Sequence, residues 1–341
     1  MSPIDPTTTD PTRRLAPVVR LAPAKLNLTL AVVGRRDDGY HALHSVMVPL
    51  GLSDRLSVAV APTGSGDSLH TTGFDPGPPA DNLVLRAIAA TRAVVARARL
   101  DAPPLAARLE KAIPVAAGLA GGSSDAAAAI DAALEAWGAA AQLGDEERVA
   151  LAASLGSDVP FFLAGGAALI EGRGERLTRL HGVTAHHGQP THAGVLLVTP
   201  PVPAHTAAVF AAWAGGAMGD PGVVRRTSEH FASEFGSGLS VQALLERAGV
   251  LASANDLWPA AAQVVPGLVP LRRALTRLVH RPIGLSGSGP TLWALYASAE
   301  EASAAADVVR QAIAAGELPF PGDGAPFVAA TTIGSGQGRI E

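Results

Sequence analysis

The stretch PVAAGLAGGSSD, residues 114–125, decides how this chain folds, and an alanine-rich run to Trp137 follows it. Gly118, Gly121 and Gly122 lack a Cβ, so the backbone can turn tightly here and direct its N–H groups toward one point. Ser123 and Ser124 stand where a helix N-cap is expected, and residues 126–136 are strong helix formers. The stretch therefore predicts a glycine-rich loop that opens directly into a helix.

Two interpretations of this loop stay open on its residues alone. The N-terminus of a helix presents free N–H groups and a positive dipole end, which together bind an anion and above all a phosphate. The alternative is a flexible linker ahead of a buried helix of small residues. No Gly-Lys-Ser/Thr follows the glycines and the spacing Gly-x-Gly-x-x-Gly is absent, so the loop is neither a Walker loop nor a dinucleotide fingerprint.

The composition narrows the class of protein. The chain has 341 residues, 48% of them hydrophobic, which is enough for two packed domains. A net charge of −4 gives no basic field, so we expect neither nucleic acid nor a membrane surface as a partner. With no cysteine, disulfides, thiolate nucleophiles and cysteine zinc sites are excluded. Residues 1–15 are rich in Pro, Thr and Asp without an apolar signal core, so a disordered tail and a cytoplasmic protein are expected.

A strand is predicted over residues 20–33. Leu26, Leu28 and Leu30 alternate with polar residues, so Lys25 and Asn27 lie on the opposite face, either solvated or lining a polar site. Lys25 and Lys111 are the only lysines among 26 cationic residues, which makes each a candidate for a specific role. Chance placement on the surface is the alternative, and it is accepted more readily for Lys111.

The rest of the chain alternates helices and strands. Helices are predicted over residues 82–99 and 144–155, with two strands at 46–50 and 55–60 that a turn joins. Asp158 follows in a short turn before an apolar strand, either beside a ligand or as a helix cap or Asx-turn. Residues 61–81 are expected to form a loop, and residues 214–240 to be irregular.

The second half has the pattern β–α–α–β–α–β, and a second glycine-rich loop occupies residues 284–290. The loop 181–193 is the predicted boundary, which divides the chain into domains 16–180 and 194–341. Its histidines lack helical spacing and a nearby carboxylate, so no metal site is predicted there.

Five motifs in order carry a resemblance to a known family. They are PAKLNL (23–28), GYH (39–41), the loop 114–125, GSDVP (156–160) and LSGSGP (285–290). Together they resemble the GHMP kinase superfamily, from about residue 20 to residue 333. The resemblance implies an α+β fold of two domains: an N-terminal ATP-binding domain like ribosomal S5 domain 2, and a C-terminal ferredoxin-like domain. Within the superfamily, it points to the kinases of isoprenoid synthesis whose acceptor is the 2-hydroxyl of a cytidine diphosphate-linked methylerythritol.

The resemblance also assigns roles to residues. It implies that Asp158 is the general base and Lys25 its electrostatic partner, with ATP and Mg²⁺ as the implied cofactors and Ser123 or Ser124 as a candidate Mg²⁺ ligand. The ATP phosphates are assigned to Pro114, Val115, Ala116, Ala117, Gly118, Leu119, Ala120, Gly121, Gly122, Ser123 and Ser124. The substrate is assigned to Asn27, Tyr40, His41, Thr206, Asn255, Asp256, Ser286, Gly287, Ser288 and Gly289. A monomer or homodimer is expected.

One departure from the superfamily falls in the loop, where Ala116, Ala117 and Ala120 stand at positions that are often glycine. Alanine narrows the allowed backbone angles but keeps the N–H donors, so phosphate binding is still expected. Two other functions remain open: a GHMP kinase of the homoserine or mevalonate type, and a ligand-binding protein of the same fold without activity. Tyr40 and His41 argue against the first, and retention of both Lys25 and Asp158 against the second.

Overall fold

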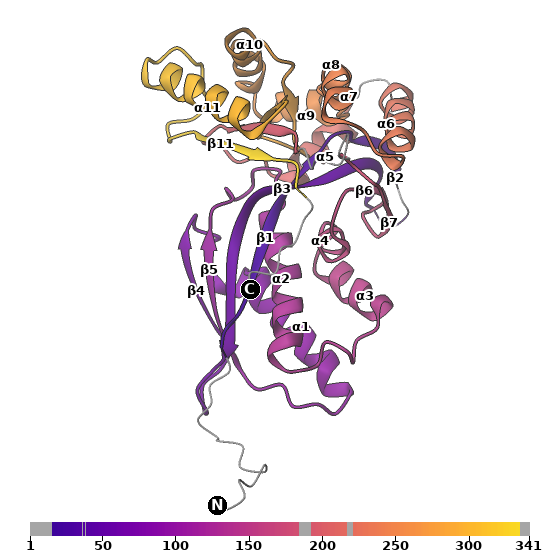
Figure 1. Ribbon diagram of the computed structural model, residues 1–341, viewed down its shortest axis with the longest axis vertical. Coiled ribbons are helices and arrows are strands. Elements are labelled where there is room, and N and C mark those ends of the chain that lie inside the picture. Colours follow the sequence, from indigo (N-terminus) through magenta and orange to yellow (C-terminus); the bar gives the residue numbers. More distant parts are fainter. Residues whose placement is uncertain (1–15, 36, 38, 184–191, 217–220, 335–341) are drawn as a thin grey trace, which may run out of the picture.

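The computed structural model describes residues 16–35, 37, 39–183, 192–216 and 221–334. The chain forms two lobes along its longest axis, and the long strand β3 runs from the lower lobe up to the second (Figure 1). The predicted tail 1–15 and most of the predicted boundary loop lie outside the described residues, so the domain limits stay a prediction. None of the described helices is long and apolar enough to cross a membrane.

The N-terminal lobe is a seven-stranded sheet with helices packed on one face. The strand order is β4-β5-β3-β6-β7, and β1 and β2 also pair with β3. The strands are β1 (Val18–Asn27), β2 (Ala31–Arg35), β3 (His41–Val60), β4 (Ser68–Gly73), β5 (Leu105–Lys111), β6 (Ala168–Gly172) and β7 (Arg176–Arg179). The helices are η1 (Pro79–Asp81), α1 (Leu83–Arg97), α2 (Gly121–Ala136), α3 (Asp145–Leu155) and α4 (Val159–Ala164).

Strand β3 corrects the turn predicted at residues 51–54. It runs unbroken for 20 residues because residues 41–47 pair with β2 and β6, residues 47–58 with β1, and residues 55–60 with β5. The register against β1 shifts between Pro23 and Lys25, so the Gly-Leu-Ser-Asp segment is absorbed as an irregularity of the ladder. Ladder hydrogen bonds on both sides of β3 thus outweigh the local turn propensity. The loop predicted at residues 61–81 likewise contains a strand, β4, which pairs in parallel with β5.

Helix α2 forms where the glycine loop predicts it, but it begins earlier. Its N-cap is Ala120, in a left-handed conformation with φ 55° and without a side-chain cap bond, so Ser123 and Ser124 lie inside the first turn. The helix is buried almost throughout, and it packs on β1, β3 and α1. Its alanines let these backbones approach closely, and one hydrophobic core joins them to Leu56 and Ile88.

The C-terminal lobe is a four-stranded antiparallel sheet in the order β11-β8-β10-β9. Its strands are β8 (Gly194–Thr199), β9 (Gly284–Leu285), β10 (Leu292–Tyr296) and β11 (Phe327–Thr332). Its helices are α5 (Thr206–Ala214), α6 (Pro221–Gly236), α7 (Val241–Glu246), α8 (Ala248–Leu251), α9 (Trp258–Val264), α10 (Leu268–Val279) and α11 (Ala299–Ala314). Helix α6 corrects the irregular segment predicted at 214–240. This α+β lobe has the ferredoxin-like strand order, which confirms the predicted fold class.

A shared hydrophobic core joins the lobes. Leu26 and Leu28 of β1 belong to one cluster with Val195 of β8 and Phe235 of α6. The opposite face of β1 is not solvated either, because Lys25 is only 4% exposed and Asn27 2%. Of the two alternatives for that face, the structure therefore favours the wall of a polar site.

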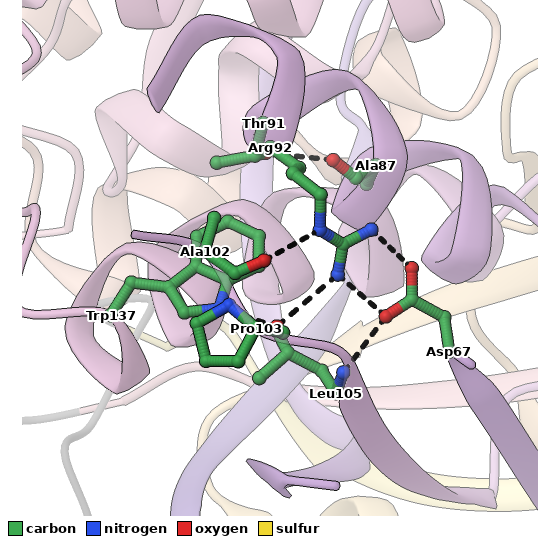
Figure 2. A network of polar contacts seen from close by, with 8 residues as sticks. All are labelled: Asp67, Ala87, Thr91, Arg92, Ala102, Pro103, Leu105 and Trp137. Carbon is green, nitrogen blue, oxygen red and sulfur yellow. Dashed lines mark hydrogen bonds and ion pairs between the residues drawn. The ribbon is translucent and has the colours of Figure 1, made fainter. Parts of the chain in front are cut away.

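A polar network fastens α1 to the start of β5 (Figure 2). Arg92 pairs with the Asp67 carboxylate and donates to the carbonyl of Ala102 at 3.0 Å, and the backbone N–H of Leu105 donates to Asp67 at 2.8 Å. Burial alone would raise the pKa of Asp67, but the hydrogen bonds from Arg92 and Leu105 outweigh it and the net shift is downward. The guanidinium also lies 5.2 Å from the ring centre of Trp137.

We expect Arg92→Met to lower the free energy of unfolding by about 1–3 kcal/mol at neutral pH, because Asp67 then loses its charged donor. The lowered pKa of Asp67 gives stability that is present above its ordinary value of 3.8 and is lost as pH falls through its folded value. Urea unfolding at neutral and acid pH measures both effects. Arg97→Met, at an exposed site of the same helix, is the control. Equal losses in the two variants would contradict the assignment.

Candidate active site

A cavity of about 860 Å³ opens between the lobes. Its walls come from β1, the glycine loop and the start of α2 on one side, and from α5 and the second glycine loop on the other. Of the residues predicted for the site, the following line it: Lys25, Asn27, Tyr40, His41, Pro114, Val115, Ala116, Ala117, Gly118, Ala120, Gly121, Gly122, Ser123, Asp158, Thr206, Gly287 and Ser288. Residues far apart in sequence thus meet at one site.

The glycine loop wraps one end of the cavity. Ala116 and Ala120 adopt left-handed backbone angles, with φ 53° and 55°, although neither is a glycine. A left-handed backbone conformation is unfavourable in free energy for alanine, so contacts in the surrounding structure must offset this strain. Leu119 and Ser124 are not part of the cavity wall: Leu119 is in the interlobe core and Ser124 is buried. The first backbone N–H groups of a helix have no hydrogen-bond partner within it. In α2 these groups belong to Gly121, Gly122 and Ser123, which line the cavity.

Gly118 is where the two glycine-rich loops touch. A Cβ at this position would lie 2.3 Å from the carbonyl oxygen of Ser286 and 2.9 Å from that of Gly289. The Oγ of Ser286 donates to the carbonyl of Gly118 at 3.0 Å. Only glycine, here with φ 74°, fits this close approach.

Lys25 lines the cavity and is held there by two hydrogen-bond acceptors. Its Nζ donates to Oδ1 of Asn27 at 2.6 Å and to the carbonyl of Gly118 at 2.8 Å. Burial lowers the pKa of Lys25, and the charge of Asp158 opposes that shift. The lysine is therefore fixed in place by two acceptors, while the field of a nearby carboxylate favours its charged form.

Asp158 stands at the N-terminus of α4, which corrects the strand predicted after it. Pro160 in the first turn of α4 suits a helix start. Although Asp158 occupies the N-cap position, its side chain makes no cap hydrogen bond there, so the predicted alternative of a helix cap is wrong. Asp158 lines the same cavity as Lys25, and its negative charge acts on the lysine. Lys25 and Asp158 do not form a direct ion pair in the described structure.

Aromatic residues surround the other end of the cavity. The ring of His41 stacks on that of Phe210 with the ring centres 5.1 Å apart, and the ring of Trp213 stands nearly perpendicular to it with its centre 5.2 Å away. The Nε2 of His41 is buried and lacks a hydrogen-bond partner in the described structure. Burial lowers the pKa of His41, and the charge of Arg35 lowers it further, so the imidazole is neutral near pH 7. Arg173 lies over the ring of Tyr40 at 4.9 Å.

Four of the residues predicted to bind the substrate do not line the cavity but contact the segments that form its wall. Asn255 donates to the carbonyls of Leu285 and Gly287 at 3.0 and 2.9 Å. Asp256 accepts the N–H of Val32 at 2.9 Å. The others are Ser286 and Gly289, which pack against Gly118, as described above. By contrast, Ser288 and Thr206 both line the cavity and their hydroxyls are 3.1 Å apart.

Several wall residues escaped the sequence reasoning. Lys111 is 5% exposed, so the surface placement accepted for it is wrong. Its rarity among the arginines was the available signal. The remaining wall residues come from separate elements, and the sequence analysis gave none of them a role: Arg35, Asn82, Asp125, Arg173 and Phe210.

Comparison with known proteins gives the family of this chain. The family model of the GHMP kinase N-terminal domain matches residues 82–166. A relative from Pelotomaculum thermopropionicum, named 4-diphosphocytidyl-2-C-methyl-D-erythritol kinase, is 38% identical over 288 residues, covering 84% of this chain and 91% of the relative.

Solved structures extend the comparison. A crystal structure of 4-(cytidine 5'-diphospho)-2C-methyl-D-erythritol kinase matches with TM-score 0.64 and 30% identity, covering 93% of this chain and 100% of that one. The homoserine kinase of Cytophaga hutchinsonii matches with TM-score 0.64 but 16% identity, covering 96% and 98% of the two chains, which shows the fold alone. On the identity and coverage of these relatives, the chain belongs to the 4-diphosphocytidyl-2-C-methyl-D-erythritol kinase family of GHMP kinases.

Proposed function

We propose that this kinase transfers the γ-phosphoryl group of ATP to the 2-hydroxyl of 4-diphosphocytidyl-2-C-methyl-D-erythritol, with Asp158 and Lys25 at the reacting centre. The observation that carries the proposal is that both side chains line one cavity with the glycine loop. A tertiary alcohol is a poor nucleophile, and the site supplies a carboxylate, an ammonium and a row of backbone amides around one space. These are the groups that phosphoryl transfer needs.

In the proposed step, Asp158 accepts the proton of the 2-hydroxyl while the hydroxyl oxygen forms its bond to the γ-phosphorus. The bond between that phosphorus and the β–γ bridging oxygen breaks, and ADP leaves with the electron pair. The products are the 2-phosphate, ADP and a proton on Asp158. Because Asp158 has no cap bond to α4, its oxygens are available to a substrate hydroxyl.

Lys25 is proposed to stabilise the transferring group. Its ammonium is held by Asn27 and Gly118, so its position does not change when charge develops on the phosphoryl oxygens. Preorganised charge in a buried site acts more strongly than the same charge in water.

The nucleotide is proposed to lie with its phosphates along residues 114–123. The left-handed turns at Ala116 and Ala120 and the free N–H groups at the start of α2 form a concave anion site. Mg²⁺ that arrives with ATP needs few protein ligands, and of the two candidate serines only Ser123 lines the cavity. When bound, the ion would neutralise phosphate charge.

The aromatic end of the cavity is proposed to hold the cytidine diphosphate. The Nε2 of His41, which lacks a partner in the described structure, offers a hydrogen bond to the edge of a pyrimidine, and Tyr40, with Arg173 over its ring, lines the same wall. Arg35 and Arg173 line the same end and carry the positive charge that binding of a diphosphate requires.

Since ATP is the phosphate donor, we propose that the enzyme acts in the cytoplasm.

A coupled assay of ADP release tests the proposal. We expect turnover of ATP with 4-diphosphocytidyl-2-C-methyl-D-erythritol, and none above background with homoserine or mevalonate. Turnover with either of the latter alone would move the enzyme to another GHMP specificity. Binding of ATP without turnover of any acceptor would support the non-catalytic alternative. Absence of a thermal shift with ATP would favour the linker interpretation of the glycine loop, since a bound ligand stabilises the native state.

A further inference from the structure

A tight turn joins β6 to β7 at the wall of the active site. The last pair of their ladder leaves residues 172–175 between the two strands. The N–H of Gly174 donates to the carbonyl of Glu171 at 3.3 Å. Inside the turn, the N–H of Arg173 donates to the carboxylate of Glu175 at 2.6 Å. These two hydrogen bonds give the turn a defined shape.

Gly174 is the residue of this turn that touches the segment of the proposed base. Its φ of 126° lies in the region that favours glycine. A Cβ at this position would lie 2.4 Å from the carbonyl oxygen of Ser157 and 3.3 Å from the Cβ of that serine. Ser157 directly precedes Asp158 in the chain. The backbone that carries the proposed base therefore rests against the turn.

The carboxylate of Asp158 depends on this backbone for its position. It makes no cap bond to α4, and within the described residues it takes part in no hydrogen bond or ion pair. An aspartate side chain is short, so a displacement of its Cα is passed on to the carboxylate almost in full. Whatever fixes the backbone at Ser157 thus also fixes the base.

The turn is also attached to the aromatic end of the cavity. Gly172 stands opposite Leu43 in the ladder between β6 and β3, close to the start of β3. The guanidinium of Arg173 lies 4.9 Å from the ring centre of Tyr40. Arg173, Tyr40 and Asp158 all line the cavity. One short segment therefore contacts both the end proposed for the cytidine diphosphate and the backbone of the base.

We propose that the turn 172–175 is a positioning device for Asp158, in which Gly174 seats the carbonyl of Ser157 and so sets the distance between the carboxylate and the acceptor hydroxyl. The inference rests on the proposed function in one respect, that Asp158 is the base. Transfer of a proton needs its two heavy atoms about 2.6–3.2 Å apart, and a misplacement of about 1 Å can lower a rate by about 10²-fold. A contact that fixes the base is therefore a contact that fixes the rate.

Gly174→Ala tests the contact. Carbon and oxygen atoms in ordinary contact lie about 3.5 Å apart, so the added methyl group must displace the carbonyl of Ser157 by about 1 Å. We expect kcat to fall by about 10–100-fold. The KM for ATP should change little, because the three atoms nearest to the new Cβ all belong to Ser157 and none to the glycine loop. A general loss of structure would instead raise the KM for ATP together with the fall in kcat.

Gly166→Ala is the matched control. Gly166 has a positive φ as well, 74°, so alanine strains the backbone there too. Its chain neighbours aside, no atom of the described residues lies within 4 Å of the Cβ position. This variant should keep the wild-type kcat. An equal fall in kcat in both variants would assign the effect to backbone strain and contradict the proposal.

A double-mutant cycle shows whether the turn acts through the base. Asp158→Asn already removes the group that the turn positions, so adding Gly174→Ala should lower the residual kcat by less than about twofold. Two defects that multiply would mean that the turn affects the rate independently of Asp158. That result would overturn the proposal.

Glu175→Ala keeps the proposal testable if Gly174→Ala does not fold. It removes the acceptor of the Arg173 N–H and so loosens the turn without adding an atom near Ser157. The kcat should fall, by a smaller factor than in Gly174→Ala, and this fall should be absent when Asp158 is already asparagine. An unchanged kcat, or an equal fall in both backgrounds, would refute the inference.

Failure of the proposed function looks different. In that case Asp158→Asn keeps the wild-type rate, or no acceptor is turned over, whether or not Gly174 is changed. Failure of this inference alone leaves an active kinase that needs Asp158 but whose rate does not depend on the turn through that residue.

Discussion

Asp158→Asn is expected to lower kcat by about 10²–10⁴-fold, because an amide cannot accept the proton of the acceptor hydroxyl. The KM for ATP should change little, since Asp158 is not part of the glycine loop. The fold should stay intact because the side chain makes no cap bond to α4, so the amide removes no hydrogen bond that the helix needs. Steady-state kinetics together with a thermal unfolding curve separate the two effects.

Asp145→Asn is the control for this variant, since it removes an exposed carboxylate from the first turn of α3. It should keep wild-type kcat. A rate for Asp158→Asn within a few fold of the wild type would remove Asp158 from the chemistry. In that event positioning and charge stabilisation alone would account for the transfer.

Lys25→Met is expected to lower kcat by about 10²–10³-fold through the loss of a fixed positive charge at the transferring phosphoryl group. The KM for ATP should rise as well, because the carbonyl of Gly118 loses the donor that holds it at 2.8 Å. This split between kcat and KM distinguishes the variant from Asp158→Asn. Methionine keeps the apolar stem, so packing in β1 should be preserved.

A pH profile adds a second readout for Lys25. Burial lowers the pKa of Lys25, so its positive charge is lost at a lower pH than is usual for lysine. Activity that needs the charged form should therefore be full below that pKa and decline as pH rises through it. The Lys25→Met variant has lower activity at every pH, and its activity should not decline further at alkaline pH. An identical alkaline decline in both proteins would assign it to another group.

The sequence predicted the site best where the chemistry is local. The glycine loop before α2 needs residues without Cβ atoms, and the alternation around Lys25 follows from strand geometry; both are visible in a short window. The first residue of α2 was harder to predict from the sequence. Ala120 takes a left-handed angle that alanine rarely adopts, so the N-cap preference of serine predicted a helix start three or four residues too late in the chain.

Features that depend on distant partners were missed for a common physical reason. The turn predicted within β3 is overridden by strands that come from before and after it in the chain. The buried position of Lys111 depends on Asp54 and Asp125, which lie 57 and 14 residues away along the chain. Pairings of this kind are set by topology and leave no periodic trace in the local sequence.

The contact at Gly118 has a consequence for engineering. Its carbonyl oxygen accepts hydrogen bonds from Lys25 in one lobe and Ser286 in the other, and neither loop leaves space for a larger residue there. With ATP assigned to the first loop and the acceptor to the second, as proposed, the two binding sites share this contact. Chimeras that graft the acceptor-binding lobe of another kinase onto this chain would have to transplant both glycine-rich loops together, as one unit.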